Sequence, residues 1–183
     1  MTLVVSPGEG STQKYMQWHW ARPLADILAG AVKLFSHDWA RLSTELPCPD
    51  DLFYVGHGSP TALGSPPLFD TKNIAEINGR IVAIACRSAM RLGPEAVADG
   101  RRRYVGFVDD LHVIDAEVLD DLIVRTFKPL LTNEWSEAEF EDHFKKDCER
   151  VQASYFAGRR RRTRDAHIIA SAAQVMKLSV RVL

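Results

Sequence analysis

The chain has 183 residues, of which 46% are hydrophobic and 26% are charged, the proportions of an ordinary globular protein that can bury a substantial core. Its formal net charge of −1 gives no overall attraction to nucleic acid or to an anionic membrane. Three scattered cysteines do not make a disulfide framework and favour a reducing compartment. The N-terminus lacks a signal-peptide pattern and no apolar run approaches the ~20 residues of a membrane span, so we expect a cytoplasmic protein with no membrane partner.

Short apolar runs alternate with segments of helical periodicity over the first 113 residues. The apolar runs predict strands at residues 3–6, 31–36, 50–55, 80–85 and 103–108. The segments between them predict helices at 14–28, 37–46 and 88–99, and a short helix within 71–79. Pro23 is expected to kink or break the first helix. Strands that alternate with helices predict an α/β fold, here a three-layer αβα sandwich with a mainly parallel sheet.

The last third of the chain is expected to be helical. Apolar residues recur at helical spacing in three segments, at 116–131, 136–156 and 166–178, followed by a short strand at 180–183. Pro129 is expected to break the first of these helices. Because the sequence contains no internal repeat and no linker, we expect a single domain over 1–183, with a sheet core at 1–113 and a helical part at 114–183.

Two chemically reactive side chains follow predicted strands. His57 comes after the strand at 50–55 and Cys86 comes after the strand at 80–85, so both belong to the carboxyl edge of a parallel sheet, where reactive groups gather. The 29 residues between them leave room for one crossover connection. Since neighbouring strands lie about 4.8 Å apart, an imidazole and a thiol placed there would come within reach of each other.

These two residues fit a nucleophilic site. The helix expected to begin near Ser88 would put its positive end at Cys86 and favour the thiolate, while His57 could protonate a leaving amine. The amide N–H groups of Gly58 and Cys86 are candidates for an oxyanion hole. The spacing alone leaves a plainer interpretation open, in which Cys86 is an inert core residue and His57 lies in a turn.

The sequences around the pair strengthen the first interpretation. The histidine block reads Tyr54-Val55-Gly56-His57-Gly58-Ser59 and the cysteine block reads Ile84-Ala85-Cys86-Arg87-Ser88-Ala89. In these blocks, and in their order, residues 3–113 resemble the caspase-like cysteine peptidases, which include caspases, metacaspases, gingipains, separases and bacterial CHAT-domain proteases. Segments 91–93 and 100–110 look like the helix and strand that follow the cysteine in CHAT and gingipain members.

The resemblance implies a caspase-like sheet and peptide-bond hydrolysis through a thioester acyl-enzyme. It makes His57 the general acid and base and Cys86 the nucleophile, with Gly58 as a donor to the oxyanion, and it implies neither a cofactor nor a metal. Small bacterial members often serve in defence or in regulated proteolysis, so the expected partners are a protein substrate and an activating protein or larger complex.

Several members of the family cleave after Arg or Lys by means of a buried acid, and in separase-like and CHAT-like members that acid follows the strand after the cysteine. Asp109 and Asp110 occupy this place, and Glu9 is a weaker candidate for the wall of the same pocket. A carboxylate that pairs with a guanidinium would select Arg. The alternative is that Asp109 and Asp110 form a solvated turn. Metacaspases carry the acid two residues before the cysteine, where this chain has Ile84.

A basic run at 158–164 has two interpretations. It is either a solvated loop or nucleic-acid patch, or a self-cleavage site for a protease that prefers basic residues. The arginines concerned are Arg159, Arg160, Arg161, Arg162 and Arg164. Two other functions stay open: a catalytically inactive caspase-like scaffold, and a nucleic-acid-binding protein that uses residues 101–103 and this run, which the net charge of −1 disfavours. The histidines show no paired spacing typical of metal ligands.

Overall fold

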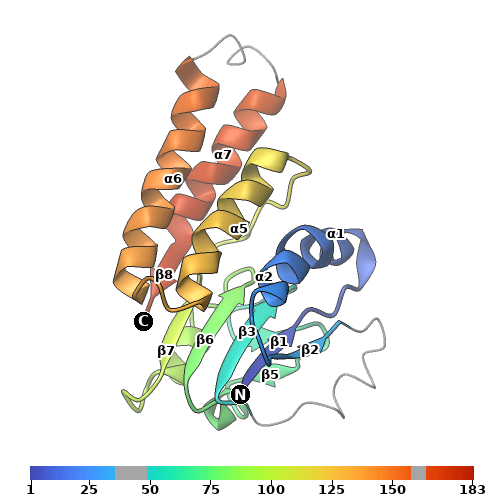
Figure 1. The fold of residues 1–183 in the computed structure, drawn as a ribbon, viewed down its shortest axis with the longest axis vertical. Coiled ribbons are helices and arrows are strands. Elements are labelled where there is room, and N and C mark those ends of the chain that lie inside the picture. Colours follow the sequence, from blue (N-terminus) through green and yellow to red (C-terminus); the bar gives the residue numbers. More distant parts are fainter. Residues whose placement is uncertain (36–48, 158–163) are drawn as a thin grey trace.

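The computed structural model describes residues 1–35, 49–157 and 164–183, and its centre is a six-stranded sheet (Figure 1). The strands lie in the order β2-β1-β3-β6-β7-β8, in which the first five are parallel and β8 runs antiparallel to β7. Their bounds are β1 Thr2–Val5, β2 Val32–Leu34, β3 Asp51–Val55, β6 Arg80–Ile84, β7 Arg103–Phe107 and β8 Val180–Val182. The predicted α/β fold with a mainly parallel sheet is therefore confirmed.

All six predicted strands are present. The central strands β1, β3, β6 and β7 are largely apolar, whereas the edge strands β2 and β8 each carry a charged residue between two apolar ones. A small antiparallel pair, β4 (Ala62–Leu63) and β5 (Phe69–Asp70), was not predicted and lies in the segment expected to be loop. The short helix expected within 71–79 is the 3-10 turn η2, Ile74–Glu76.

Neither Pro23 nor Pro129 ends its helix, so the break predicted at Pro129 is wrong, whereas the distortion predicted at Pro23 takes the form of a π turn. The first helix continues through α1 (Gly10–Met16), the π turn η1 (Gln17–Ala21) and α2 (Arg22–Asp26), which includes Pro23. In the π turn the N–H of Arg22 reaches back five residues to the carbonyl of Gln17, and this wider turn just before Pro23 accommodates the proline ring. Helix α5 (Glu117–Leu131) likewise runs past Pro129, near its end, where the buried side chains of the last turn hold it against the core.

The sheet divides the hydrophobic core into two clusters. On one face, residues such as Phe53 and Val105 pack against α1 to α2, α5, α6 (Glu137–Ala157) and α7 (Arg164–Ser179). On the other face, residues such as Leu52 and Tyr104 meet the shorter segments β4, β5, η2 and α4 (Leu92–Ala96). Among the described residues, the long helices therefore cover one face. The helix expected at 37–46 lies outside the described residues.

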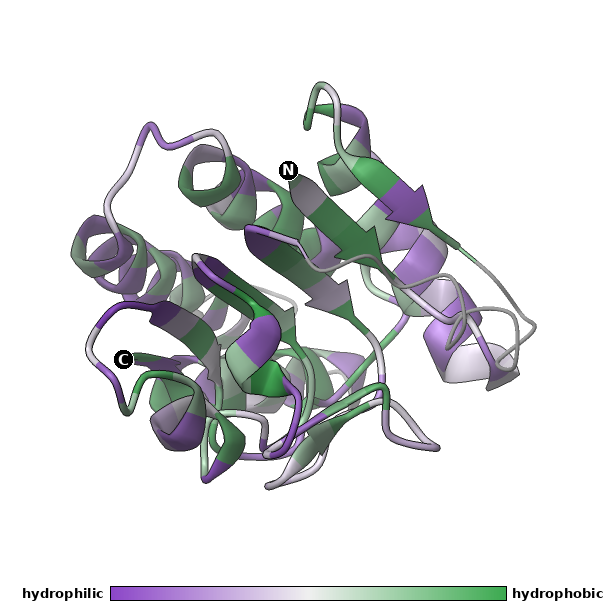
Figure 2. Ribbon diagram, turned by 90° about the horizontal axis from the view of Figure 1, so that it is seen from below, coloured by the Kyte–Doolittle hydropathy of each residue, from purple (hydrophilic) through white to green (hydrophobic). Residues whose placement is uncertain are grey.

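The carboxyl ends of the parallel strands share one edge of the sheet. The α6–α7 hairpin packs against the sheet at the start of α6 and the end of α7. Its other end extends far beyond the edge formed by the carboxyl ends of the strands (Figure 1). The strands are coloured mainly as hydrophobic, whereas the helices alternate between hydrophobic and hydrophilic bands (Figure 2). No helix among residues 1–35, 49–157 and 164–183 combines the length and apolar character needed to cross a membrane.

Candidate active site

The register of β3 and β6 sets His57 beside Cys86. Val55 is paired with Ile84, and the N–H of Gly56 donates to the Ile84 carbonyl at 3.2 Å just beyond the strands. His57 and Cys86 are each two residues past that last pair, so their backbones leave the same edge side by side. The side chain of Cys86 packs against the core cluster that includes Val55 and Ile84.

Gly58 is the point of closest approach between the two loops. A Cβ at this position would lie 2.5 Å from the carbonyl oxygen of Cys86 and 2.8 Å from the Cβ of Ala85. No residue with a side chain fits there without displacing one of the loops. The backbone that carries His57 therefore packs directly on the backbone that carries Cys86.

The loop after His57 is held from the other side. The carbonyl of His57 accepts a hydrogen bond from Gly64 N–H at 2.9 Å, and Ser59 N–H donates to the carbonyl of Ala62 at 2.9 Å. The residues that flank Gly58 make these bonds, so its own N–H has no acceptor in the described part of the chain. Gly58 is half-buried, and its free N–H fits the predicted role of an oxyanion donor.

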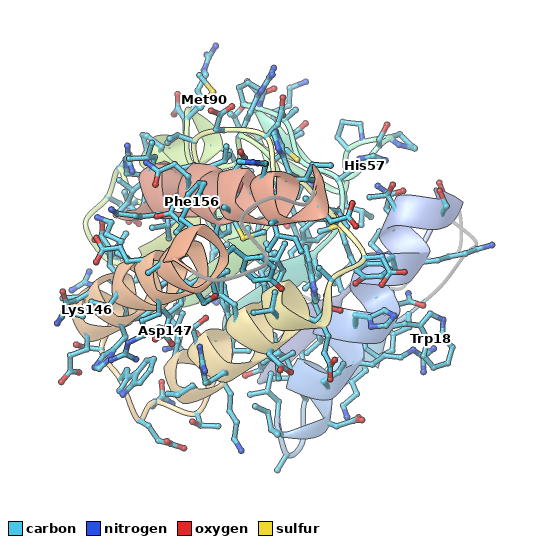
Figure 3. All side chains as sticks on the ribbon, turned by 90° about the horizontal axis from the view of Figure 1, so that it is seen from above. Trp18, His57, Met90, Lys146, Asp147 and Phe156 are labelled. Carbon is cyan, nitrogen blue, oxygen red and sulfur yellow. The ribbon has the colours of Figure 1, made fainter. Side chains whose placement is uncertain are left out.

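The imidazole of His57 is exposed and projects at the rim of the molecule (Figure 3). No side chain among the described residues hydrogen-bonds to it, so no carboxylate orients the ring. Both ring nitrogens are free to exchange a proton with a ligand or with solvent.

Cys86 is half-buried, and its surroundings change the pKa of its thiol in opposing directions. Burial raises the pKa of the Cys86 thiol above its ordinary value. The N–H of Leu111, which donates to Sγ at 3.2 Å, works in the opposite direction. The carboxylate of Asp110 raises the pKa further, while the guanidinium of Arg87 lowers it. The expectation of a thiolate favoured by a helix end is therefore wrong.

The reason lies in the segment after the cysteine. The helix predicted at 88–99 is only α4, five residues long, and it begins six residues past Cys86. Residues 86–91 form a turn that bonds to the end of β7, with Ala89 N–H donating to the Phe107 carbonyl at 2.9 Å. Pro94, which favours the first turn of a helix, is the signal that could have placed the start correctly.

The three acids predicted to bind a basic side chain all follow strands at the same edge. Asp110 forms an ion pair with Arg87, and both side chains are about half exposed. Asp109 is exposed, and its carboxylate accepts the N–H of Asp110 at 2.8 Å. Glu9 follows β1 and precedes α1, partly exposed. Asp110 is thus already neutralised within the chain, by a partner that sequence reasoning did not identify.

Arg87 also has unusual backbone geometry. Its φ is 54°, in the left-handed region that residues other than glycine seldom adopt. Its N–H donates to the carbonyl of Asp109 at 3.1 Å, so the residue directly after Cys86 is fixed to the loop after β7 by its backbone as well as its side chain. The conformation of the turn around the thiol is therefore fixed by its contacts with the loop after β7.

Arg102, the central residue of the possible nucleic-acid-binding segment at 101–103, makes its contacts within the protein. Arg102 is largely buried and donates to the carbonyls of Ala75 at 2.6 Å and Ala96 at 3.4 Å, besides an ion pair with Asp99 at 2.8 Å. It therefore ties η2 and α4 to β7. Residues 159–162 and Cys48 lie outside the described residues, and Arg164 begins α7, so the predicted self-cleavage site stays a prediction.

Among the described residues, no group of three or more His, Cys, Asp or Glu side chains is arranged to hold a metal ion. Cys148 is fully buried in α6, far along the chain from the candidate site. Comparison with protein-family models, with curated proteins and with solved structures finds no match to this chain, so its own geometry carries the functional inference.

Proposed function

We propose that the protein is a caspase-like cysteine endopeptidase with His57 and Cys86 as its catalytic dyad. The observation that carries the proposal is the contact at Gly58, where the loop bearing the imidazole lies against the backbone of Cys86. The strand order, with the histidine strand directly beside the cysteine strand, is the one implied by the resemblance. Thiol catalysis requires a nucleophilic thiol and a group that exchanges its proton, and the two adjoining loops carry a half-buried thiol and an imidazole.

In this mechanism the thiol proton passes to His57 as Sγ bonds to the carbonyl carbon of the scissile peptide. The N–H of Gly58 stabilises the resulting oxyanion. His57 then gives its proton to the leaving amine, and a thioester remains on Cys86. Water attacks the thioester while His57 takes one of its protons, and the proton returns to sulfur as the carboxylic acid product leaves.

The raised pKa of the Cys86 thiol sets one condition on this chemistry. Because burial raises the pKa of Cys86, His57 must remove the proton during or just before attack. An activating partner that brings the imidazole closer to Sγ would therefore switch the enzyme on. This fits a role in regulated proteolysis, including bacterial defence.

We propose a preference for Arg or Lys before the scissile bond, with Asp109 and Asp110 as the acids. Asp110 can bind a substrate cation only after its ion pair with Arg87 opens. The cation of the substrate would replace that of Arg87, so the exchange need not leave a carboxylate unpaired. Exposed ion pairs stabilise by only about 0–1 kcal/mol, so the opening is accessible.

The test is cleavage of a fluorogenic peptide library by the wild type, Cys86→Ala and His57→Ala. We expect cleavage after basic residues by the wild type and loss of at least about 1000-fold in both variants. Cys148→Ala serves as a matched control, since it removes a buried thiol away from the candidate site. Activity that survives Cys86→Ala would count against the proposal.

A catalytically inactive scaffold is the second candidate, and the raised pKa of Cys86 is the observation that favours it. A peptide with an Arg before a thiol-reactive acyloxymethyl ketone separates the two candidates. Covalent labelling at Cys86, lost in His57→Ala, supports the peptidase. An unlabelled Cys86 under every activating condition tried would support the scaffold.

A further inference from the structure

Two adjoining cavities form a groove beside the candidate active site. One has a volume of about 520 Å³ and lies between the start of α5 and the facing ends of α6 and α7. The other has a volume of about 440 Å³ and lies between α5 and the helix η1 to α2. Asp115 and Glu117 line both, so the two cavities adjoin at the start of α5, and together they are called the groove.

A short segment of the chain connects the groove to the thiol. Leu111 donates its N–H to Cys86 Sγ, and Ile114, three residues further on, already lines the larger cavity. Three residues span at most about 11 Å, so the wall of the groove starts within that distance of Leu111. The projecting α6–α7 hairpin forms the far wall (Figure 1). Trp18 lines the second cavity, away from Leu111. His57 and Trp18 lie toward the same side of the molecule (Figure 3).

The charged side chains that line the groove are mainly acidic, and His19, which also lines it, lies 3.4 Å from Asp120. Five carboxylates line it, those of Asp115, Glu117, Asp120, Asp121 and Asp165, and no Lys or Arg is among the described lining residues. Asp120 is held by Tyr15 and Trp20 at 2.7 and 2.6 Å. The other four make no ion pair with a Lys or Arg of the described chain. The net charge of the whole chain is only −1, so this is a local concentration of negative charge.

Between the carboxylates the groove is apolar. Ile114, Val118 and Ile169 are partly buried along it, whereas Ile168 is 40% exposed and Trp18 is 60% exposed. The guanidinium of Arg22 stacks over the Trp18 ring at 4.2 Å, so a substrate cation would rest on this ring only at its opposite face or by displacing Arg22. Arg and Lys side chains, with an aliphatic stem and a cationic head, match such a surface. Phosphate-bearing ligands, including nucleic acid, are repelled.

We propose that this groove binds an extended Arg- and Lys-rich segment of the protein substrate, as a docking site separate from the pocket for the residue before the scissile bond. The identification of that segment as part of the substrate rests on the proposed peptidase function. Binding itself does not, because none of the groove carboxylates belongs to the proposed dyad. The helical last third of the chain would thereby recognise the protein that the sheet edge cleaves.

Binding is measured on Cys86→Ala protein, so that cleavage cannot interfere. The probe is a fluorescein-labelled peptide of alternating Arg and Ala, read by fluorescence anisotropy, and a peptide of alternating Glu and Ala is the charge-reversed control. The groove variant combines Asp115→Asn, Glu117→Gln and Asp165→Asn. We expect its affinity for the basic peptide to fall about tenfold, two- to threefold for each carboxylate removed.

The matched control neutralises three acids outside the groove, with Asp26→Asn, Glu134→Gln and Asp142→Asn, and therefore has the same net charge. It should bind the basic peptide as the parent does, and both triple variants should keep the parent melting temperature. Equal affinity of the two triple variants, or equal binding of the acidic peptide, overturns the docking site. If the groove variant alone loses binding but no peptide is ever cleaved by the wild type, the docking site stands and the peptidase proposal fails.

Discussion

Replacing Gly58 with alanine tests the contact on which the candidate active site depends. The new Cβ would lie 2.5 Å from the Cys86 carbonyl oxygen, whereas ordinary contact begins at 3.4 Å, so one loop must move by about 0.9 Å. Such overpacking costs about 1–3 kcal/mol of unfolding free energy, which lowers Tm by roughly 2–12 °C in a protein of this size. A misplacement of about 1 Å between catalytic groups lowers the rate by about 100-fold.

The assay pairs thermal unfolding with peptide cleavage. Gly100→Ala is the control, since its φ of 69° makes alanine costly by about 1–2 kcal/mol while its Cβ would meet nothing within 4 Å. We expect the two variants to lose similar stability, but only Gly58→Ala to lose activity. A Gly58→Ala protein with normal Tm and full activity would falsify the contact. Equal loss of activity in both variants would trace the effect to stability.

Four further predictions concern the thiols and the arginines. The rate of iodoacetamide alkylation of Cys86, followed by peptide mass mapping, should still rise above pH ~8.5, the ordinary pKa of a thiol, because burial raises the pKa; a plateau below pH 8 would contradict this. Burial raises the pKa of Cys148 to about 12, so the unfolded chain loses this proton first and the free energy of unfolding, measured in urea, should fall as the pH rises from about 8.5. Arg87→Gly should melt about 2–4 °C above Arg87→Ala, since both lack the ion pair and only glycine adopts a φ of 54° without strain; equal Tm values would show no strain there. Arg102→Lys should lower the free energy of unfolding, measured in urea, by about 2–3 kcal/mol, because lysine cannot reach both carbonyls. Arg101→Lys, at an exposed position, should leave that free energy within about 0.5 kcal/mol of the wild-type value.

The sequence was sufficient for the sheet and for the order of its reactive residues. A buried strand is a contiguous apolar run, so β3 and β6 were visible in it, together with His57 and Cys86 after their ends. Parallel pairing then sends all carboxyl ends to one edge, whatever the details of the helices. This is why the candidate dyad could be predicted without any contact being known.

Local patterns failed where a tertiary contact competes with them. The turn after Cys86 bonds to the loop after β7, so the helix expected from Ser88 is replaced and no helix begins at the thiol. Proline did not end α2 or α5, since a π turn and buried packing hold these helices. In each case a partner distant in sequence decided the local conformation.

Only the tertiary structure revealed the groove and the ion pair that Asp110 forms with Arg87. Residues 114–118 and Asp165 are about 50 positions apart, and they meet because α5, α6 and α7 fold back on one another beyond the sheet edge. Asp110 is separated from Arg87 by a strand and a helix, yet the two side chains pair. Hydrophobic periodicity determines which elements form, because it is a local property of the chain. Which charges face one another depends on how those elements pack, and no single stretch of the sequence contains that information.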